Sequence, residues 1–197
     1  MIVITGDIVN REMNEFPAAL ACMQRMEAKY GPYICEGNHD VIPGIYAIAG
    51  ACKRNGLPFL YNECATVPFG NGRLVIGGLA WRRYLEMDAQ PGMVAQLFPA
   101  RQPGDVRLLL AHHPDLFDIA QESDLLLSGH THGGQIMCGD IGLGRLRFKY
   151  WSGLYRRPDS PCQMIVSNGC GDWFPCRIGA PAEIGLLRLT AAKTTSD

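Results

Sequence analysis

Residues 125–135 read LLLSGHTHGGQ, an apolar run that ends in a loop with two histidines and three glycines. A short continuous apolar run of this kind is typical of a strand buried on both faces of a sheet. Three further runs end in the same way, each at a tight loop that carries Asp, Asn or His. They are residues 2–5 before Gly6-Asp7, residues 33–35 before 37–40, and residues 106–111 before 112–114.

This arrangement indicates both the fold class and the place of the site. Layered α/β proteins build their ligand sites at the carboxyl ends of the strands, and loops held by a rigid sheet carry the function. We therefore predict an α/β fold with its site in the loops that follow these four strands. The length of 197 residues suits one domain over residues 1–197, with a sizeable core.

The rest of the chain supplies elements that would cover the sheet. Helical spacing predicts one helix over residues 14–30, which Asn14 can cap and Gly31-Pro32 ends. Residues 80–104 show no clean period, so we interpret them as a variable cap or loop. The other predictions are a helix over 43–55, a hairpin of strands 64–69 and 73–78 that turns at Gly70-Asn71-Gly72, a short helix over 115–121, and tail strands near 164–167 and 184–190.

The composition excludes several classes of protein. Hydrophobic residues make up 47% of the chain and charged residues 19%, which is typical of a globular protein. The net charge of −1 offers no basic field for a nucleic-acid backbone, so we expect no nucleic acid as a stable partner. The sequence contains no run of 18 apolar residues, so we expect no spanning membrane segment. The N-terminus lacks the basic region and the long apolar region of a signal peptide. We expect a cytoplasmic chain or one peripheral to the membrane.

Three basic clusters and eight cysteines need separate interpretations. Arg82-Arg83, residues 145–149 and Arg156-Arg157 are interpreted as solvated faces, although an arginine near an active site could meet a phosphate. The cysteines form no CxxC pair and are interpreted mainly as buried thiols of a reducing compartment. The best candidates for a disulfide are Cys162, Cys170 and Cys176.

The strand-end loops carry oxygen and imidazole donors of the kind that bind Zn, Mn or Fe. The five donors are Asp7, Asn38, His112, His130 and His132. His130 and His132 alternate, so on a strand-like turn they would point to the same side. Two ions roughly 3.5–4 Å apart would stabilise the attacking and leaving oxygens of an in-line displacement.

Each donor alone has a structural explanation, because an Asp after a strand is most often a turn residue and a lone His is most often a satisfied core residue. However, the chain has only five histidines, and all five fall in these loops. Their coincidence favours a metal site. Asp40, Asp140 and Asp172 are interpreted at this level as loop carboxylates or as supports for a ligand.

The motifs resemble a known family. GDIVN (6–10), GNHD (37–40), LLLAHHPD (108–115) and LSGHTHGGQ (127–135) occur in the order of the successive motifs of the calcineurin-like metallophosphoesterases. GLYRRP (153–158), VSNGCG (166–171) and PAEIGLLRL (181–189) are similar to the branch with the bacterial YkuE and YaeI phosphodiesterases. Some members of that branch act on lipid-A precursors such as UDP-diacylglucosamine.

The resemblance implies a four-layer α/β/β/α sandwich that hydrolyses phosphomono- or phosphodiesters by attack of a metal-bound hydroxide. It implies two ions of Mn, Fe or Zn, bridged by Asp7. Asn38, His112 and His130 would complete the second metal site, and His132 would bind the first. His39 would contact the phosphate and protonate the leaving group, with Asp40 orienting its imidazole. His113 would support the site or be exposed.

One family motif is absent from the sequence. The family opens with a strand that ends in Asp-x-His, which supplies two ligands of the first metal, and no Asp-x-His occurs here. The first site then keeps only Asp7 and His132, so this chain is expected to bind as few as one ion. We expect the domain to be incomplete at its N-terminus, without the first strand and helix. The apolar sheet edge left open would favour a homo-oligomer.

Three explanations of this departure stay open. The chain could be an N-terminally truncated part of a longer enzyme. It could be a mononuclear or weakened hydrolase. It could also be a degenerate, non-catalytic metal-binding or scaffold protein that keeps the fold.

Overall fold

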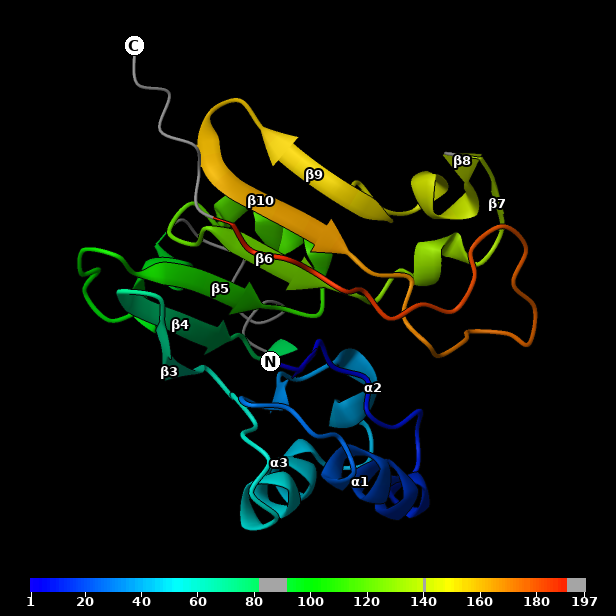
Figure 1. Ribbon diagram of the computed structural model, residues 1–197. Helices are drawn as coiled ribbons and strands as arrows, with labels where there is room; N and C mark the ends of the chain where they lie inside the picture. The colour runs from blue at the N-terminus through cyan, green and yellow to red at the C-terminus, as the bar shows by residue number, and fades with distance from the viewer. Residues whose placement is uncertain (82–91, 140, 191–197) are drawn as a thin grey trace.

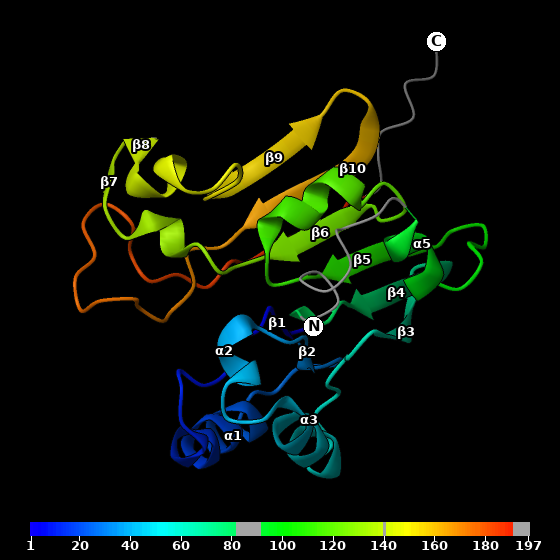
Figure 2. The same ribbon diagram turned by 180° about the vertical axis from the view of Figure 1, so that it is seen from behind.

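The computed structural model describes residues 1–81, 92–139 and 141–190 (Figure 1). It has the mixed α/β architecture that the sequence predicts, with a central six-stranded sheet. A smaller sheet faces one side of this central sheet, and helices cover the outer face of each (Figures 1 and 2). The order of layers is therefore helix, sheet, sheet, helix, as the resemblance implies.

The central sheet has the strand order β3-β4-β5-β6-β10-β9. Its four inner strands are parallel to one another, and the two edge strands β3 and β9 run antiparallel to their neighbours. The six strands are β3 (Glu63–Phe69), β4 (Gly72–Gly78), β5 (Val106–Leu110), β6 (Leu125–Ser128), β9 (Gly153–Arg157) and β10 (Ser160–Val166).

The smaller sheet pairs β1 (Val3–Ile4) with β2 (Tyr33–Ile34) in parallel. Ile34 also bridges Phe59 in parallel, and the N–H of Leu60 donates to the Ile34 carbonyl at 2.7 Å. Among the described residues, β1 pairs with β2 alone. One edge of β1 is thus left without a described partner strand.

The helices are short and lie on the two outer faces. α1 and α3 lie beyond the smaller sheet, whereas α5 and the 3-10 helix η2 cover the outer face of the central sheet, which is turned toward the viewer in Figure 2. The β7-β8 hairpin and two short 3-10 helices follow β6. The bounds of the helices and of this hairpin are η1 (Met13–Glu15), α1 (Phe16–Gln24), α2 (Asn38–Val41), α3 (Ile45–Arg54), α5 (Met93–Leu97), η2 (Pro114–Ile119), η3 (His132–Gly134), β7 (Met137–Cys138), β8 (Ile141–Gly142) and η4 (Leu143–Leu146).

Three apolar cores fill the spaces between the four layers. The first packs α1 and α3 on the smaller sheet, with Ile48 and Ile34 fully buried. The second lies between the sheets and includes Cys35 and Leu110. The third packs η2 and α5 on the far face of the central sheet, around Phe117. The inner strands β5 and β6 are buried on both faces of the sheet, which explains why they are continuous apolar runs rather than alternating ones.

Most predicted elements are present, with two exceptions. Residues 184–190 form no strand, although a strand was predicted there, and the side chain of Leu186 is 99% exposed. The helix predicted over residues 14–30 covers only Phe16–Gln24, without a side-chain cap from Asn14. At the β3-β4 turn Gly70 takes a positive φ of 57°.

Within residues 80–104, part of the predicted loop is a helix, α5. Residues 82–91, which include Arg82 and Arg83, lie outside the described residues, as does Asp140. No cysteine forms a disulfide, and Cys162 is buried beside Ser123. None of the described helices has the length and apolar character needed to cross a membrane.

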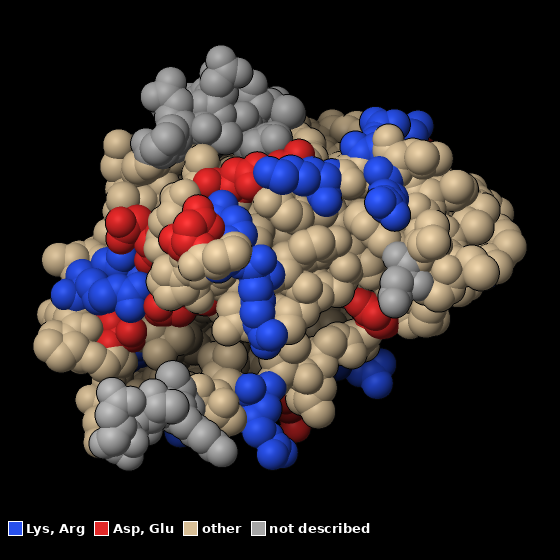
Figure 3. Space-filling model, turned by 90° about the horizontal axis from the view of Figure 1, so that it is seen from above, with Lys and Arg blue, Asp and Glu red and all other residues tan. Residues whose placement is uncertain are grey.

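The face seen from above shows no continuous field of one sign (Figure 3). Basic and acidic side chains lie next to one another on it among the described residues. Two of the predicted basic clusters are paired in this way: Lys149 contacts Asp118, and Arg157 lies near Asp118 and Asp159. This mixed surface agrees with the prediction of a solvated face for most of these residues.

The loops after β1 and β2 approach each other more closely than side chains would allow. A Cβ added to Gly37 would lie 2.2 Å from both the N and the Oδ1 of Asp7. A Cβ added to Gly6 would lie 2.5 Å from the N of Gly37, and Gly6 has a φ of 90°. Only glycine fits at these two positions, because backbone atoms fill the space where a Cβ would be.

We predict that Gly37→Ala lowers the free energy of unfolding by about 3 kcal/mol, because the added methyl group must displace both the backbone N and the carboxylate of Asp7, which is held by hydrogen bonds. Urea unfolding of the metal-free protein measures this. The matched control is Gly185→Ala, where a Cβ would meet nothing within 4 Å. This control should change the free energy by less than about 0.5 kcal/mol. Equal stability of the two variants would contradict the prediction.

Candidate active site

Four strand-end loops meet on one side of the two facing sheets. Asp7 follows β1, Asn38 begins α2 after β2, His112 follows β5, and His130 follows β6. The ligand atoms of Asp7, His112 and His130 lie within 4.8 Å of one another. Asn38 joins this group through His130. The structure therefore brings together four of the five donors predicted from the sequence.

Asp7 is held by its backbone and by two contacts of its carboxylate. It has a positive φ of 56°, which an Asp adopts more readily than most residues. Oδ1 accepts the backbone N–H of His39 at 2.9 Å, and Oδ2 lies 3.0 Å from Nε2 of His112. Burial opposes ionisation of the carboxylate, but the close contact with His112 and the positive charge of its protonated ring lower the pKa of Asp7 below its ordinary value.

His112 offers a test of whether a metal ion fits. Its Nδ1 lies 2.6 Å from the Thr5 carbonyl, and since a carbonyl oxygen only accepts, Nδ1 carries the proton. In a neutral ring Nε2 then carries a lone pair, which faces the carboxylate of Asp7 without a hydrogen bond of acceptable geometry. A second proton or a cation resolves this contact. Burial favours the neutral ring, but Asp7 raises the pKa of His112.

A metal ion suits these atoms better than a single proton, because it can satisfy Asp7, His112 and His130 together. A proton on His112 would satisfy only the contact with Asp7. Carboxylate and imidazole are usual ligands of Zn, Mn and Fe. The residues present thus fit a transition-metal ion.

His130 lies in an aromatic environment beside Asn38. Its Nδ1 contacts Oδ1 of Asn38 at 2.9 Å. Its ring centroid lies 5.0 Å from those of His112 and Trp81 and 4.9 Å from that of His113. Burial, with a smaller contribution from the charge of His112 and His113, lowers the pKa of His130 to about 3. The imidazole is therefore neutral at ordinary pH, which is the form that binds a metal.

His132 stands apart from this group. The sequence predicts a strand-like turn for His130-Thr131-His132, but φ is 69° at His130, −84° at Thr131 and 51° at His132. Thr131 is buried, and its hydroxyl donates to the Trp151 carbonyl. His132 is not among the clustered ligand atoms of the described residues. Its Nδ1 donates instead to the Gly171 carbonyl at 2.7 Å.

His39 and Asp40 are adjacent but have separate partners. The Nδ1–H of His39 donates to the Asn10 carbonyl at 2.5 Å. The Asp40 carboxylate accepts backbone N–H groups of Asp7, Ile8, Val9 and Gly37 at 2.8–3.3 Å. The resemblance implies that Asp40 orients the His39 imidazole, and the structure corrects this role. The two residues follow each other in the helix α2, and consecutive helical side chains do not face each other.

His113, next to His112, has the opposite tautomer. Its Nδ1 accepts the backbone N–H of Asp115 at 3.2 Å, so this atom carries no proton. Burial lowers the pKa of His113, and the ring is thus neutral with its proton on Nε2. His113 is half-buried beside His130 rather than exposed. It supports the packing of the site without presenting an Nε2 lone pair.

A cavity of about 590 Å³ opens over these residues. Three of the lining residues, Asn38, His39 and His130, were predicted as site residues, whereas the basic and aromatic side chains of the lining were not. The lining residues are Asn10, Arg11, Asn38, His39, His130, Arg147, Phe148, Asp172 and Trp173. Arg147 belongs to the basic cluster 145–149, so one arginine of that cluster does reach the site.

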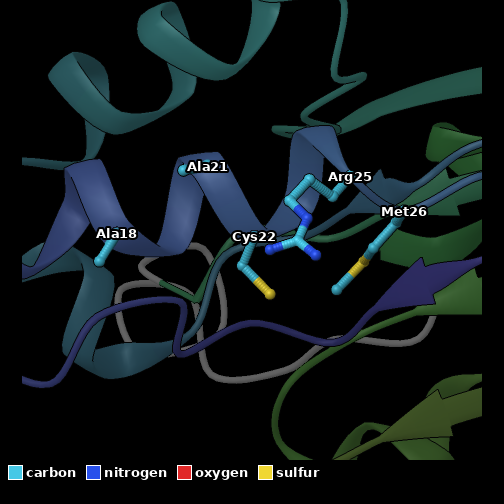
Figure 4. A pocket seen from close by; sticks show the side chains of 5 residues that line it. All are labelled: Ala18, Ala21, Cys22, Arg25 and Met26. Carbon is cyan, nitrogen blue, oxygen red and sulfur yellow. The ribbon is translucent and has the colours of Figure 1, made fainter.

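A second hollow of about 500 Å³ lies on α1 and has no such chemistry (Figure 4). It is lined by Ala18, Ala21, Cys22, Arg25 and Met26. It holds no donor of the strand-end loops, so the candidate site is the cavity at His39.

The loop of residues 168–180 was missed by the sequence reasoning, although it borders the site. Buried Gln135 binds this loop by accepting the N–H of Trp173 at 2.5 Å and donating to two carbonyls, those of Phe174 and Cys176. Gln135 is the last residue of the motif LSGHTHGGQ, and this was the only signal of its role. Asp172, interpreted as a loop carboxylate, pairs with Arg177 at 2.5 Å.

Comparison with known proteins places this geometry in a family. The model of the calcineurin-like phosphoesterases matches residues 1–134. An uncharacterized metallophosphoesterase of Helicobacter pylori strain J99 is 32% identical over 193 residues, which are 96% of this chain and 50% of the relative. The metallophosphoesterase YkoQ of Bacillus subtilis is 27% identical over 93% of this chain and 70% of the relative. The phosphodiesterase YaeI of Escherichia coli is 27% identical over 96% and 70%.

The chain spans about half the length of the Helicobacter relative, so the relatives contain further residues that have no counterpart here. The similarity to YaeI and YkoQ agrees with the branch that the motifs GLYRRP, VSNGCG and PAEIGLLRL indicate.

The lowered pKa of His130 predicts a pH dependence of the metal-free protein. The folded value of about 3 lies below the ordinary value of 6.5, so the folded state disfavours protonation. The resulting stability is fully present above about pH 6.5 and is lost as the pH falls toward 3. Between pH 6.5 and 5.5 the loss should approach about 1 kcal/mol.

The measurement is urea unfolding with chelator across this pH range, for wild type and for His130→Gln. The variant lacks the titrating imidazole, so its free energy of unfolding should depend less steeply on pH than that of wild type. Parallel curves for the two proteins would show that His130 titrates normally in the folded state.

Proposed function

The chain belongs to the calcineurin-like phosphoesterase family, and we propose from this membership that it hydrolyses phosphomono- or phosphodiesters at the cluster of Asp7, Asn38, His112 and His130. The observation that carries the proposal is the contact of the His112 Nε2 with Oδ2 of Asp7 at 3.0 Å, where two electron-rich atoms need a proton or a metal ion between them. A metal ion would satisfy the nearby ligand atom of His130 as well.

In this proposal Asp7, Asn38, His112 and His130 hold one transition-metal ion, and Asp7 and His132 contribute to a second. A bound ion of Mn, Fe or Zn would supply Lewis-acid catalysis and lower the pKa of a coordinated water. The protein keeps the ligands ready for this. Thr5 fixes the tautomer of His112, and the low pKa of His130 keeps its ring neutral.

His39 is proposed to protonate the leaving group. Its Nδ1–H is bound to the Asn10 carbonyl, and the side chain lines the cavity beside Asn38 and His130. Nε2 is therefore the ring atom that can serve the substrate. Only the doubly protonated imidazolium carries a proton on Nε2 as well as on Nδ1. Donation of that Nε2 proton would let the leaving oxygen depart as a neutral alcohol and return the ring to its neutral Nδ1–H form, a step that contributes typically 10²–10⁴-fold to the rate of such reactions.

Arg11 and Arg147 give the cavity its positive charge for a phosphate. Phe148 and Trp173 form an apolar part of the wall, with their ring centroids 6.0 Å apart. This wall suits an aromatic or a lipid-linked group next to the phosphate. We infer a phosphoester substrate with an apolar portion.

The experiment compares two diesters in the presence of added Mn²⁺. Bis-p-nitrophenyl phosphate has a good leaving group that needs little protonation, whereas diphenyl phosphate has a poor one. We expect Asp7→Ala to lower the turnover of both diesters by at least about 100-fold. We expect His39→Ala to lower the turnover of diphenyl phosphate by about 10²–10⁴-fold and that of the activated diester less.

The control is Glu63→Ala, which removes an exposed carboxylate that pairs with Lys53 outside the site. It should leave both rates unchanged. Turnover that survives both Asp7→Ala and His39→Ala would refute the mechanism. Metal analysis distinguishes the hydrolase from a non-catalytic metal-binding or scaffold protein. One ion or none per chain, together with no turnover at high Mn²⁺, would favour the non-catalytic protein.

We further propose that two copies of the chain associate through the edge of β1. This edge has no described partner strand, and Val3 and Ile4 are only partly buried. Strand edges of this kind pair readily with another chain. Light scattering should report a dimer whose population falls when Ile4→Lys places a charge on the edge. A monomer at all concentrations would contradict this.

A further inference from the structure

Arg177 is the residue that ties the loop of residues 168–180 to His132. Its side chain is only 11% exposed, in a loop whose other side chains are mostly exposed. Nη1 donates to the carbonyls of His132 and Ala180 at 3.3 and 2.9 Å. Nη2 donates to the carbonyl of Asn168 at 3.0 Å. Buried arginines with several carbonyl partners fix the backbone that they contact.

The Gly171 carbonyl is shared by His132 and Arg177. It accepts Nδ1–H of His132 at 2.7 Å and also accepts from Nη2 of Arg177. Nη2 lies 3.2 Å from Nδ1 itself. Since Nδ1 donates to the carbonyl, it cannot also accept from the guanidinium. The three groups therefore form one arrangement with two donors and a single acceptor.

This arrangement fixes the ring of His132. With its proton on Nδ1, the neutral imidazole keeps its lone pair on Nε2. The charge of Arg177 next to the ring disfavours a second proton. Trp173 covers the ring, with 5.2 Å between the centroids. Asp172 holds the guanidinium from the other side, through Nε.

We propose that Arg177 is a positioning residue that holds His132 as its Nδ1–H tautomer, with Nε2 presented as a metal ligand. The proposal rests on the proposed function, in which His132 binds the first metal ion. Nothing in the sequence motifs assigns a role to Arg177. Hydrogen bonds of this kind to a ligating histidine typically change metal affinity by 10–100-fold.

The first test needs no metal. Long-range ¹H–¹⁵N spectra report the tautomer of each histidine in the chelator-treated protein at about pH 8, where histidine is neutral. His132 is assigned by its absence in His132→Ala. We expect wild type to show the Nδ1–H tautomer, and Arg177→Lys to show a mixture of tautomers. The lysine keeps the charge but cannot contact the carbonyls of His132, Ala180, Asn168 and Gly171 together with Asp172.

The second test is calorimetric titration with Mn²⁺ alone. Wild type should show a tighter site and a weaker one, and Arg177→Lys should weaken only the weaker site, by about 10–100-fold. Asp172→Asn, which loses only the ion pair, should shift the same site less. The control is Arg107→Lys, at another buried arginine that pairs with Glu122 far from the site. It should change neither the tautomer nor the affinity.

The outcomes separate this inference from the proposed function. If His132→Ala leaves Mn²⁺ binding unchanged, His132 is no ligand, and both its assignment and the inference from it fail. If His132→Ala abolishes the weaker site but Arg177→Lys changes neither the tautomer nor the affinity, only the role of Arg177 is wrong. If Arg177→Lys does not fold, Asp172→Asn decides through the same two measurements.

Discussion

The carboxylate of Asp40 holds the N-terminal half of the site together. It is fully buried and accepts backbone N–H groups from both the loop after β1 and the loop after β2. Burial raises the pKa of Asp40 to about 6, with the Asp7 carboxylate adding to the rise and the backbone hydrogen bonds opposing it. These bonds allow Gly6 and Gly37 to approach as closely as they do. They also fix the direction of the Asp7 side chain, since Asp7 donates its own N–H to Asp40.

The general plan of the site could be predicted from the sequence because strand ends and donor residues are local features. Each apolar run ended where a strand ends, and each donor followed such a run. The role of Asp40 could not be predicted, because it depends on the direction of one side chain within a helix of four residues, Asn38–Val41. A rotation of about 100° per residue turns Asp40 away from His39 and toward the loop after β1.

The hydrogen bonds that hold the histidine ligands could not be predicted from the sequence, because their partners are far away along the chain. His112 and Thr5 are 107 residues apart, and His132 and Gly171 are 39 apart. The acceptors are backbone carbonyls, which every residue has, so no residue type marks them. The prediction of a strand over residues 184–190 was wrong because the local pattern was taken as sufficient. Its apolar pattern suits a strand, but a strand also requires a paired backbone, and the described residues pair none with it.

Most histidines of the site have the same kind of hydrogen bond at Nδ1, whichever strand-end loop they belong to. Four of the five histidines have Nδ1 bound to an oxygen: His39 to Asn10, His112 to Thr5, His130 to Asn38, and His132 to Gly171. An oxygen partner at Nδ1 leaves Nε2 as the reactive atom of each ring, whether it is to bind a metal or to carry a proton.

His113 is the exception, since its Nδ1 accepts a backbone N–H. The neighbours His112 and His113 thus differ in chemistry although they are identical in the sequence. Only the ring whose Nδ1 donates to an oxygen can offer Nε2 to a cation, and this physical difference favours His112 over His113 as a ligand. The backbone carbonyls of Thr5, Asn10 and Gly171 therefore belong to the site as much as the side chains do.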